Sequence, residues 1–398
     1  MEIRPILSTL LRNRTGAILI ALQIALTMAV IINSAFIIVE RSQTMARPTG
    51  VDAGQIVLAR AVSVGADLDV RSIIDADVRA LLEIEGVENA TKLSTMPLSN
   101  SGSNSGYHLT SDNESPAFAM AYYQGDINLL DTLGVTVTSG RWFTPDEIVY
   151  DPADGEVPSA VLLSDAMAKE AFEEVDPVGK FIYTATGQAI EVIGTYDQMS
   201  RPWYNWGDFY NTGIFPHVEL NFMYAVRVAP GRADELVPVI EKALADIDND
   251  RLVAGTRTMD EMVKRTYQRD VAMNRMLTIV MALVVFITAL GIVGLASFSV
   301  AQRKRQIGTR RAIGAQKFHI LRYFLVENWL ITTAGIVLGL LLSFAINSYL
   351  VVTYNFAKLD PLYVPLVVLG LWGVGLLATL GPARSAMRVD PAIATRNI

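Results

Sequence analysis

The sequence predicts a polytopic α-helical membrane protein with four transmembrane helices and a large extracytoplasmic α/β domain between the first and second helices. Its 398 residues are 51% hydrophobic and only 18% charged, whereas soluble proteins carry about 25% charged residues. Four runs lack Asp, Glu, Lys and Arg: Thr15–Val39, Met276–Gln302, Asn328–Ala357 and Pro361–Ala383. Each exceeds the about 20 residues that a helix needs to cross hydrocarbon, where backbone polar groups must be satisfied internally.

The runs and their flanks divide the chain into nine expected segments. In chain order they are a cytoplasmic interfacial amphipathic helix (1–14), transmembrane helix 1 (15–39), the extracytoplasmic α/β domain (40–270), transmembrane helix 2 (271–302), a cytoplasmic basic coupling loop or helix (303–323), transmembrane helix 3 (324–352), a short extracytoplasmic loop (353–361), transmembrane helix 4 (362–382) and a cytoplasmic tail (383–398).

Positive charge predicts the orientation. Three short segments beside the spans are basic: Arg4, Arg12 and Arg14; then Arg303, Lys304, Arg305, Arg310, Arg311, Lys317 and Arg322; then Arg384, Arg388 and Arg396. The positive-inside rule places these segments, and both termini, in the cytoplasm. The stretch Glu40–Asn274 holds 36 acidic and 18 basic residues, and we expect it outside.

The first 14 residues have a helical apolar stripe, formed by Ile3, Ile6, Leu7, Leu10 and Leu11. Such a helix would lie in the cytoplasmic interface, and a simple charged flank is the alternative. The following apolar core is too long for a cleaved signal peptide, so we interpret it as a retained anchor.

The outer segment shows alternating strand and helix patterns. Strand patterns occur in "QIVLARAVSV", "IEVIGTYD" and "MYAVRVAPG". Helix patterns occur in "DVRALLEIEGV", ending at Gly86, in "SDAMAKEAFEEV" after the N-cap candidate Ser164, and in "RADELVPVIEKALADID". The chain has no cysteine, so disulfides cannot stabilise this domain.

Two loops of the outer segment differ from the rest. The stretch 98–107, "LSNSGSNSGY", is rich in Ser, Gly and Asn and is expected to be flexible. The stretch 200–217 concentrates aromatic residues, among them Trp203, Tyr204, Trp206, Phe209 and Tyr210. These rings could contact a partner or substrate, or they could fold back onto their own domain.

Two features of the apolar spans concern packing. From Met259 to Gln302 there is no proline, which allows one continuous helix of roughly 65 Å from the outer domain through the second span. Gly335 and Gly339 form a G-x-x-x-G pattern that permits close helix packing in the third span.

Residue patterns typical of catalysis are scarce. The histidines His108, His217 and His319 are far apart in sequence, so a zinc site is not expected. The sequence contains no P-loop pattern, no G-x-S-x-G and no H-E-x-x-H. The apolar spans carry no central charge, which argues against an ion relay. We therefore expect a non-catalytic chain that binds no cofactor itself.

The basic patch between the second and third spans has a more specific pattern than charge alone. If "QIGTRRAIGAQKF" is helical, Ile307, Arg311, Gly314 and Ala315 share one face. Small residues beside an arginine permit close approach of another protein, with the guanidinium bound to a carboxylate or carbonyl.

This patch resembles the signature of the MacB/FtsX/LolC-type ABC permeases, roughly (R/K)-E-I-G-x-R-(R/K)-A-(L/I)-G-A. The chain has "RQIGTRRAIGA", with Gln306 where the family usually has Glu, so an ion pair there is not implied. The tail "GPARSAMRVDPAIATRN" is similar to the closing family motif. The outer blocks "LLEIEGVENAT", "LLDTLGVTVTSGRWFTPDE", "VLLSDAMAKEAFEEVDPVGKFI" and "IEVIGTYDQM" resemble the MacB-like periplasmic core domain.

The resemblance implies a permease subunit of a bacterial inner membrane with its large domain in the periplasm. It implies a separate ABC ATPase subunit that holds ATP with Mg²⁺, and a second permease copy or paralogue. ATP-driven closure of the ATPase would be transmitted to the outer domain, a mode called mechanotransmission. A periplasmic adaptor and an outer-membrane channel are possible further partners, besides the lipid bilayer; nucleic acid is not one.

On this basis, we expect the ATPase-coupling residues to be Ile307, Gly308, Arg310, Arg311, Gly314 and Ala315. Efflux is the leading function. The alternatives are an FtsX-like signalling permease that activates an extracytoplasmic hydrolase, a lipoprotein-extracting permease, and a passive receptor that needs no ATPase.

Overall fold

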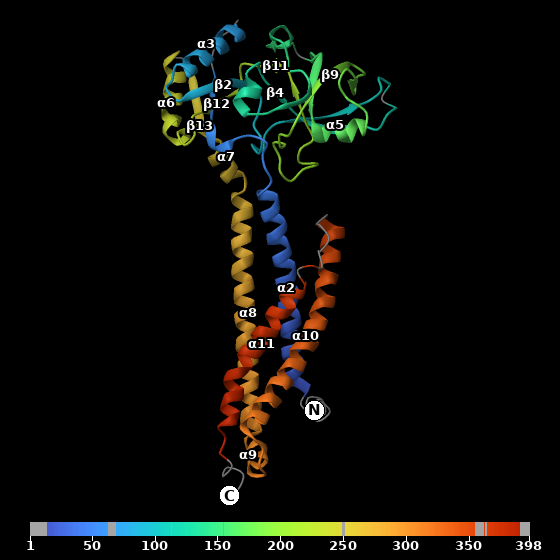
Figure 1. Ribbon diagram of the computed structural model, residues 1–398, viewed down its shortest axis with the longest axis vertical. Helices are drawn as coiled ribbons and strands as arrows, with labels where there is room; N and C mark the ends of the chain where they lie inside the picture. Colours follow the sequence, from blue (N-terminus) through green and yellow to red (C-terminus); the bar gives the residue numbers. More distant parts are fainter. Residues whose placement is uncertain are drawn as a thin grey trace. The chain divides into compact units, whose positions relative to one another are not determined.

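The computed structural model describes residues 14–62, 69–112, 114–153, 155–248, 251–354, 362 and 364–390. The predicted interfacial helix therefore lies outside the described residues, apart from its last residue. Internal contacts divide the chain into two compact units. We call residues 46–269 the inserted domain and the remainder the helical unit, and each is described separately (Figure 1).

Within its described residues, the helical unit contains four helices that are long and apolar enough to cross a membrane, which confirms the predicted fold class. They are α2 (Arg14–Met45), α8 (Gln268–Gln302), α10 (Lys317–Tyr354) and α11 (Val364–Met387), coloured blue, gold, orange and red in Figure 1. A short helix, α9 (Lys304–Ala312), connects α8 to α10.

The glycine pair of α10 packs directly on α2. A Cβ atom at Gly335 would lie 2.7 Å from the Ile24 Cβ, and one at Gly339 would lie 2.5 Å from the Met28 Cβ. Backbones this close gain van der Waals contact that larger residues would prevent. The G-x-x-x-G pattern therefore marks a real helix–helix contact.

Polar side chains also connect the helices of this unit. Thr27 and Thr288 share a hydrogen bond of 2.7 Å between α2 and α8, and Asn328 donates to the Gly375 carbonyl of α11 at 2.9 Å. Such bonds satisfy groups that hydrocarbon would leave unpaired.

The continuous helix that the sequence allows from Met259 to Gln302 is interrupted in the structure. Helix α7 (Met259–Thr266) ends before Tyr267, and α8 begins one residue later. The Tyr267 ring is buried and stacks edge-on against Tyr204, with centroids 4.9 Å apart. This tertiary contact favours a turn at Tyr267, so α8 alone is about 52 Å long at ~1.5 Å per residue.

The described part of the inserted domain is built on three sheets. The antiparallel four-stranded sheet has the order β13-β1-β12-β2, the mixed seven-stranded sheet has the order β5-β9-β7-β10-β4-β3-β8, and β11 pairs with β6. The strands are β1 (Ile56–Val62), β2 (Val87–Leu93), β3 (Ser103–His108), β4 (Phe118–Gln124), β5 (Val137–Gly140), β6 (Val149–Tyr150), β7 (Ala160–Ser164), β8 (Phe181–Thr184), β9 (Ala189–Tyr196), β10 (Thr212–Phe215), β11 (His217–Val218), β12 (Met223–Val228) and β13 (Leu252–Thr258).

Both faces of strand β1 are covered, which explains its nearly continuous apolar sequence. Val57, Ala59 and Ala61 pack under α3 (Val70–Leu82) and α6 (Ala233–Asp246). Ile56 and Leu58 face the opposite way, into a core shared with α4 (Leu129–Leu133), α7 and the seven-stranded sheet.

The expected local elements form, with shifted ends. Ser164 caps α5 (Asp165–Phe172) by accepting a hydrogen bond from the Met167 amide. Helix α3 starts at Val70, seven residues before the predicted pattern "DVRALLEIEGV" begins at Asp77. It ends at Leu82, before the expected end at Gly86. In α6, Leu236, Ile240 and Leu244 are buried as the spacing predicts.

The Ser/Gly/Asn-rich stretch 98–107 is not simply a flexible loop. Its second half forms β3, which pairs with β4 along Ser103–Tyr107 and with β8 at Tyr107 and His108. Composition disfavours this strand, but backbone pairing on both sides and burial of Tyr107 stabilise it.

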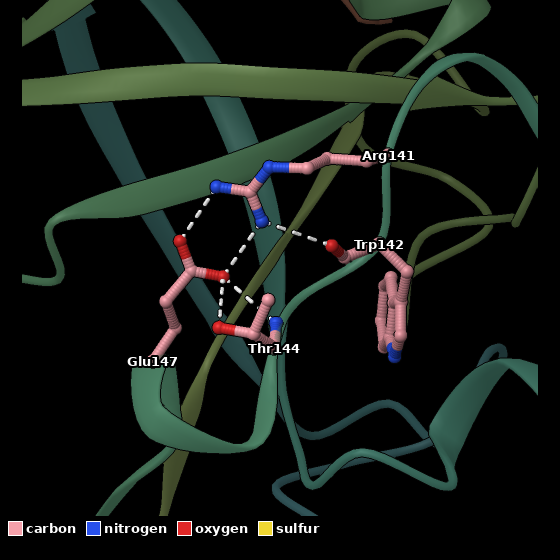
Figure 2. A network of polar contacts seen from close by, with 4 residues as sticks. All are labelled: Arg141, Trp142, Thr144 and Glu147. Carbon is pink, nitrogen blue, oxygen red and sulfur yellow. Dashed lines mark hydrogen bonds and ion pairs between the residues drawn. The ribbon is translucent and has the colours of Figure 1, made fainter.

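A polar network fixes the turn that follows β5 (Figure 2). Arg141 binds both Glu147 carboxylate oxygens at 2.7 and 2.8 Å, and Glu147 also accepts from the Thr144 amide and hydroxyl. The bond from Arg141 is the main reason that the pKa of Glu147 falls to about 2. These residues belong to the family-like block "SGRWFTPDE", so part of that motif has a structural role.

Candidate functional site

The short helix α9 and its two turns form the candidate site that the basic patch predicts. Arg303 separates α8 from α9, and a turn through Gly314 leads into α10. Gly314 has φ +102°, a left-handed conformation that glycine adopts readily and that ends the helix. Because α9 stops at Ala312, the prediction that Gly314 and Ala315 share a helical face with Ile307 and Arg311 is wrong.

The side chain of Ile307 anchors α9 to the rest of the helical unit. It is buried in an apolar cluster with residues of α8, α10, α11 and the segment after α11: Val300, Ile320, Phe324, Ala383, Ala386 and Val389. Gly308 is buried beside it. These two residues therefore shape the site and do not present a contact surface.

The guanidinium of Arg311 forms a second anchor. It donates to the carbonyl of Met387 at 3.3 Å and to the carbonyl of Val389, beyond the end of α11. The backbone carbonyls at a helix C-terminus carry partial negative charge, which favours a cation there. The Arg311 guanidinium thus binds backbone carbonyls. The sequence analysis expected a carboxylate or carbonyl of another protein, but these carbonyls belong to its own chain.

An ion pair forms the third anchor. Arg303 contacts both carboxylate oxygens of Glu327 on α10, at 2.9 and 3.0 Å, and both side chains are largely buried. A mostly apolar cavity of about 270 Å³ between α2, α8, α10 and α11 includes this pair in its lining. Arg310, near the end of α9, lies over the Tyr323 ring at 5.4 Å from its centroid.

The sequence analysis missed the most exposed apolar groups of this segment. Ile313 is 83% exposed in the turn after α9, and Phe318 is 64% exposed at the start of α10. Of the predicted coupling residues, Arg310 and Gly314 are exposed, whereas Arg311 and Ala315 are half-buried. The residue types of Ile313 and Phe318 are visible in the basic segment, but their exposure depends on where α9 ends and α10 begins.

The aromatic loop, residues 200–217, folds back onto the inserted domain over most of its length. Phe209 is buried and Tyr204 packs on Tyr267, while the Tyr210 hydroxyl donates to the Pro48 carbonyl at 3.0 Å. Buried Arg201 donates to three carbonyls, those of Ala119, Trp206 and Asn211.

Two tryptophans of this loop remain accessible. Trp206 is 55% exposed and stacks edge-on against half-buried Trp203, with ring centroids 5.3 Å apart. Trp206 is thus the most exposed ring of the loop, while Tyr204 and Tyr210 are half-buried as Trp203 is.

The inserted domain also contains a buried charged cluster that the sequence analysis missed. Asp77 on α3 and Arg251 before β13 are 0% and 1% exposed and form a bidentate pair. The Tyr224 hydroxyl donates to Asp77, and the Lys92 ammonium lies 3.9 Å from the centroid of the Tyr224 ring. The strand pattern of β2 gives no sign that Lys92 points inward.

Lys92 makes the stability of the inserted domain sensitive to pH. It is fully buried, its Nζ has no hydrogen-bond partner among the described residues, and desolvation lowers its pKa to about 7. In the unfolded chain, lysine stays protonated up to a pH of about 10.4. Between pH 7 and 9 the unfolded state therefore binds more protons, and stability rises with pH.

We expect the free energy of unfolding of the inserted domain to rise by about 2 kcal/mol from pH 7 to pH 9. Urea titrations followed by tryptophan fluorescence measure this change. In Lys92→Met the rise should disappear, while Lys169→Met, which changes a lysine of α5, should keep it. A wild-type stability that is flat over this range contradicts the assignment.

Two family models match the sequence of this chain. The MacB-like periplasmic core domain matches residues 17–241, and the FtsX-like permease C-terminal domain matches residues 278–391. The second match includes the entire candidate site around α9.

Individual relatives agree with these matches. The macrolide export ATP-binding/permease protein MacB of Chromobacterium violaceum is 26% identical over 269 residues, which cover 65% of this chain and 40% of that protein. The uncharacterized ABC transporter permease YknZ of Bacillus subtilis is 23% identical over 338 residues, covering 80% of this chain and 78% of that protein. The matched part of this chain thus covers only about two fifths of the length of MacB proteins such as that of Chromobacterium violaceum.

Among solved structures, the periplasmic region of MacB from Actinobacillus actinomycetemcomitans covers 57% of this chain at 13% identity, with a TM-score of 0.35. The family assignment rests on the sequence matches. Four apolar helices and a MacB-type periplasmic domain fit an inner-membrane protein. Since the periplasmic core model alone matches more than half of its residues, the chain belongs to the MacB/FtsX-like family of ABC transporter permeases.

Proposed function

We propose that this chain is a transport subunit in which α9 receives force from a separate ABC ATPase and passes it to the inserted domain. The ATPase holds ATP with Mg²⁺, and the permease chain itself does no chemistry. The subunit works as a pair with a second copy or a paralogue. Its task is export, and a periplasmic adaptor and an outer-membrane channel are its further partners.

The observation that carries this proposal is the way α9 is held. Ile307 fixes it to an apolar cluster, Arg311 to the end of α11, and Arg303, just before α9, to Glu327 of α10. A helix held at three points moves as one body with the helices it contacts, because packed interiors deform little. Force applied to α9 therefore reaches α8, α10 and α11 together.

The exposed side chains next to α9 supply the receiving surface. Ile313 and Phe318 lie outside the apolar runs, in the segment that the positive-inside rule assigns to the cytoplasm. Burial of such side chains in a partner's pocket is a common source of binding energy. Arg310, exposed on the same segment, adds positive charge for an acidic rim on the ATPase.

Helix α8 is the element best suited to transmit the movement. It runs unbroken from Gln268 to Gln302, from the junction with the inserted domain to the start of the α9 segment. The runs Met276–Gln302 and Asn328–Ala357 contain no ionisable Asp, Glu, Lys or Arg. This composition favours mechanical transmission over an ion or proton relay.

A second function, activation of an extracytoplasmic hydrolase without transport, is favoured by the Trp203–Trp206 pair. Exposed tryptophan in a loop is typical of protein contact sites. The two functions differ in which protein associates with the inserted domain, an adaptor or a wall hydrolase.

The coupling proposal predicts that Ile313→Asp weakens ATPase binding about 30-fold. Burying an aliphatic side chain of this size contributes about 2 kcal/mol, and a buried aspartate opposes it further. The measurement is recovery of the ATPase with the tagged permease in mild detergent, with co-purifying chains identified by mass spectrometry.

Two further variants sharpen this test. Gln306→Glu adds the same charge to exposed surface of α9 and should leave ATPase recovery unchanged. Arg311→Glu should still insert and bind, but ATP hydrolysis should no longer depend on the inserted domain, because the contact with α11 is lost. Equal recovery with Ile313→Asp and Gln306→Glu, or normal coupling in Arg311→Glu, contradicts the proposal.

A further inference from the structure

An open groove of about 510 Å³ lies on the inserted domain where β1 and β13 meet α7 and the loop 98–101. Its floor is apolar and includes Leu58, Met223 and Met262. Its walls are polar, formed by Ser99, Asn100, Ser101, Thr266 and three arginines. A volume of this size is within the range of protein ligand sites.

The three arginines come from three different elements. Arg60 belongs to β1, Arg257 to β13 and Arg265 to α7. Arg265 pairs with Glu261 at 2.7 Å on an exposed face, but neither Arg60 nor Arg257 has an ion pair or side-chain hydrogen bond within the described part of the chain. In a domain with twice as many acidic as basic residues, uncompensated arginines in one groove form a local site for negative charge.

The loop that forms one wall is held in an unfavourable conformation. Leu98 and Asn100 have φ of +61° and +57°, which is rare for leucine in particular. Hydrogen bonds to the loop stabilise this shape: Leu98 N to the Arg201 carbonyl at 3.1 Å, and Thr266 Oγ1 to the Leu98 carbonyl at 2.6 Å. Strain maintained by surrounding bonds is a feature of binding sites.

Strand β13 supplies an unused backbone edge beside the groove. It is the last strand in the order β13-β1-β12-β2, and no described strand pairs with its other side. Ala254 and Gly255, which line the groove, are exposed on it. An extended peptide can add to such an edge through backbone hydrogen bonds.

We propose that this arginine groove binds an acidic segment of a partner protein, which adds to the edge of β13 and places its carboxylates against Arg60, Arg257 and Arg265. The inference goes beyond the proposed function, since it assigns a docking site on the inserted domain and does not depend on the ATPase.

The apolar floor and the strand edge favour a peptide over a small anion. Successive side chains of a strand point to opposite faces, so acidic residues at every second position lie on one side, about 7 Å apart. That spacing lets two carboxylates reach different arginines, while the backbone pairs with β13. An inorganic anion would use only the charges, and neither the floor nor the edge.

The test uses the full-length detergent-solubilised protein and a fluorescein-labelled ten-residue peptide of alternating Glu and Thr. Fluorescence anisotropy at low salt measures its affinity. We expect at least tenfold tighter binding than for a peptide of alternating Gln and Thr, and a marked loss at 0.3 M salt.

Variants assign the binding to the groove. Arg60→Gln and Arg257→Gln should each weaken binding about fivefold to tenfold, because each removes a charge-assisted contact. Arg79→Gln, an exposed charge removed from α3 of the same domain, is the matched control and should bind as the wild type does. The side chains of Arg60 and Arg257 make no hydrogen bond with the described residues, so neither substitution should change the thermal midpoint of unfolding. An unchanged midpoint shows that the variant is folded.

Three results would overturn the inference. They are equal affinity for the Glu and Gln peptides, an equal effect of Arg79→Gln and Arg60→Gln, or arginine-dependent binding of inorganic phosphate or phosphatidylglycerol vesicles without binding of the Glu peptide. ATPase recovery should be normal in Arg60→Gln, so failure here is distinguishable from failure of the coupling proposal.

Discussion

Arg251→Met is expected to lower the free energy of unfolding of the inserted domain by about 3–5 kcal/mol. Arg251 and Asp77 are almost completely buried, and each donor–acceptor pair between them is short. Without the arginine, the Asp77 carboxylate keeps only the hydrogen bond from the Tyr224 hydroxyl among the described residues. Domains of this kind have a total stability of about 5–15 kcal/mol, so the loss is a large fraction.

Urea unfolding followed by tryptophan fluorescence measures this effect. The double variant Asp77→Leu/Arg251→Met should be less destabilised than Arg251→Met alone, because it removes the buried carboxylate together with its arginine and costs only the hydrogen bond that the Tyr224 hydroxyl donates to Asp77. Arg79→Met, on the exposed side of α3, should change stability by no more than about 0.5 kcal/mol. If the single and double variants lose the same stability, the pair is not what stabilises this region.

Gly339→Leu is expected to disrupt the contact between α2 and α10 and to destabilise the helical unit by more than about 3 kcal/mol. Even a Cβ atom at this position would lie 2.5 Å from the Met28 Cβ and 2.9 Å from the Ala25 carbonyl oxygen. These atoms are close to or part of the α2 backbone, so they cannot move aside without separating the helices.

The matched control for this variant lies in α11. A Cβ atom at Gly373 meets nothing within 4 Å, so Gly373→Ala should leave stability unchanged or raise it slightly. Size-exclusion chromatography in detergent and the thermal midpoint measure both variants. Monodisperse Gly339→Leu with a wild-type midpoint would contradict the packing described for α2 and α10.

Hydropathy was sufficient to predict the four spans, because a membrane imposes a length and a composition on any helix that crosses it. The break at Tyr267 was not predictable in the same way. No proline lies between Met259 and Gln302 and the glycines there, Gly291 and Gly294, are far from the break, whereas Tyr267 at the break packs on Tyr204, far away in sequence. Local propensity sets which conformations a segment can adopt at low cost, and tertiary contacts determine which of them is stable in the folded protein.

The candidate site shows the same limit. The residue types of the patch suggested an arginine bound to a carboxylate or carbonyl of another protein, whereas in the structure Arg311 binds the carbonyls of Met387 and Val389 in its own chain. The exposure of Ile313 and Phe318 likewise depends on where α9 ends. Charge patterns identify a segment, whereas its contact surface follows from packing.

The strand order of the four-stranded sheet has a consequence for biogenesis. Ile56 pairs with Arg227, and Val62 pairs with Leu252, so β1 cannot complete its ladders until nearly the entire domain has been synthesised. At ~5–20 residues per second, the delay is on the order of 10–40 seconds. During that time β1 and β2 have unpaired edges and exposed apolar side chains, which makes the nascent domain a substrate for chaperones and proteases before its last strand arrives.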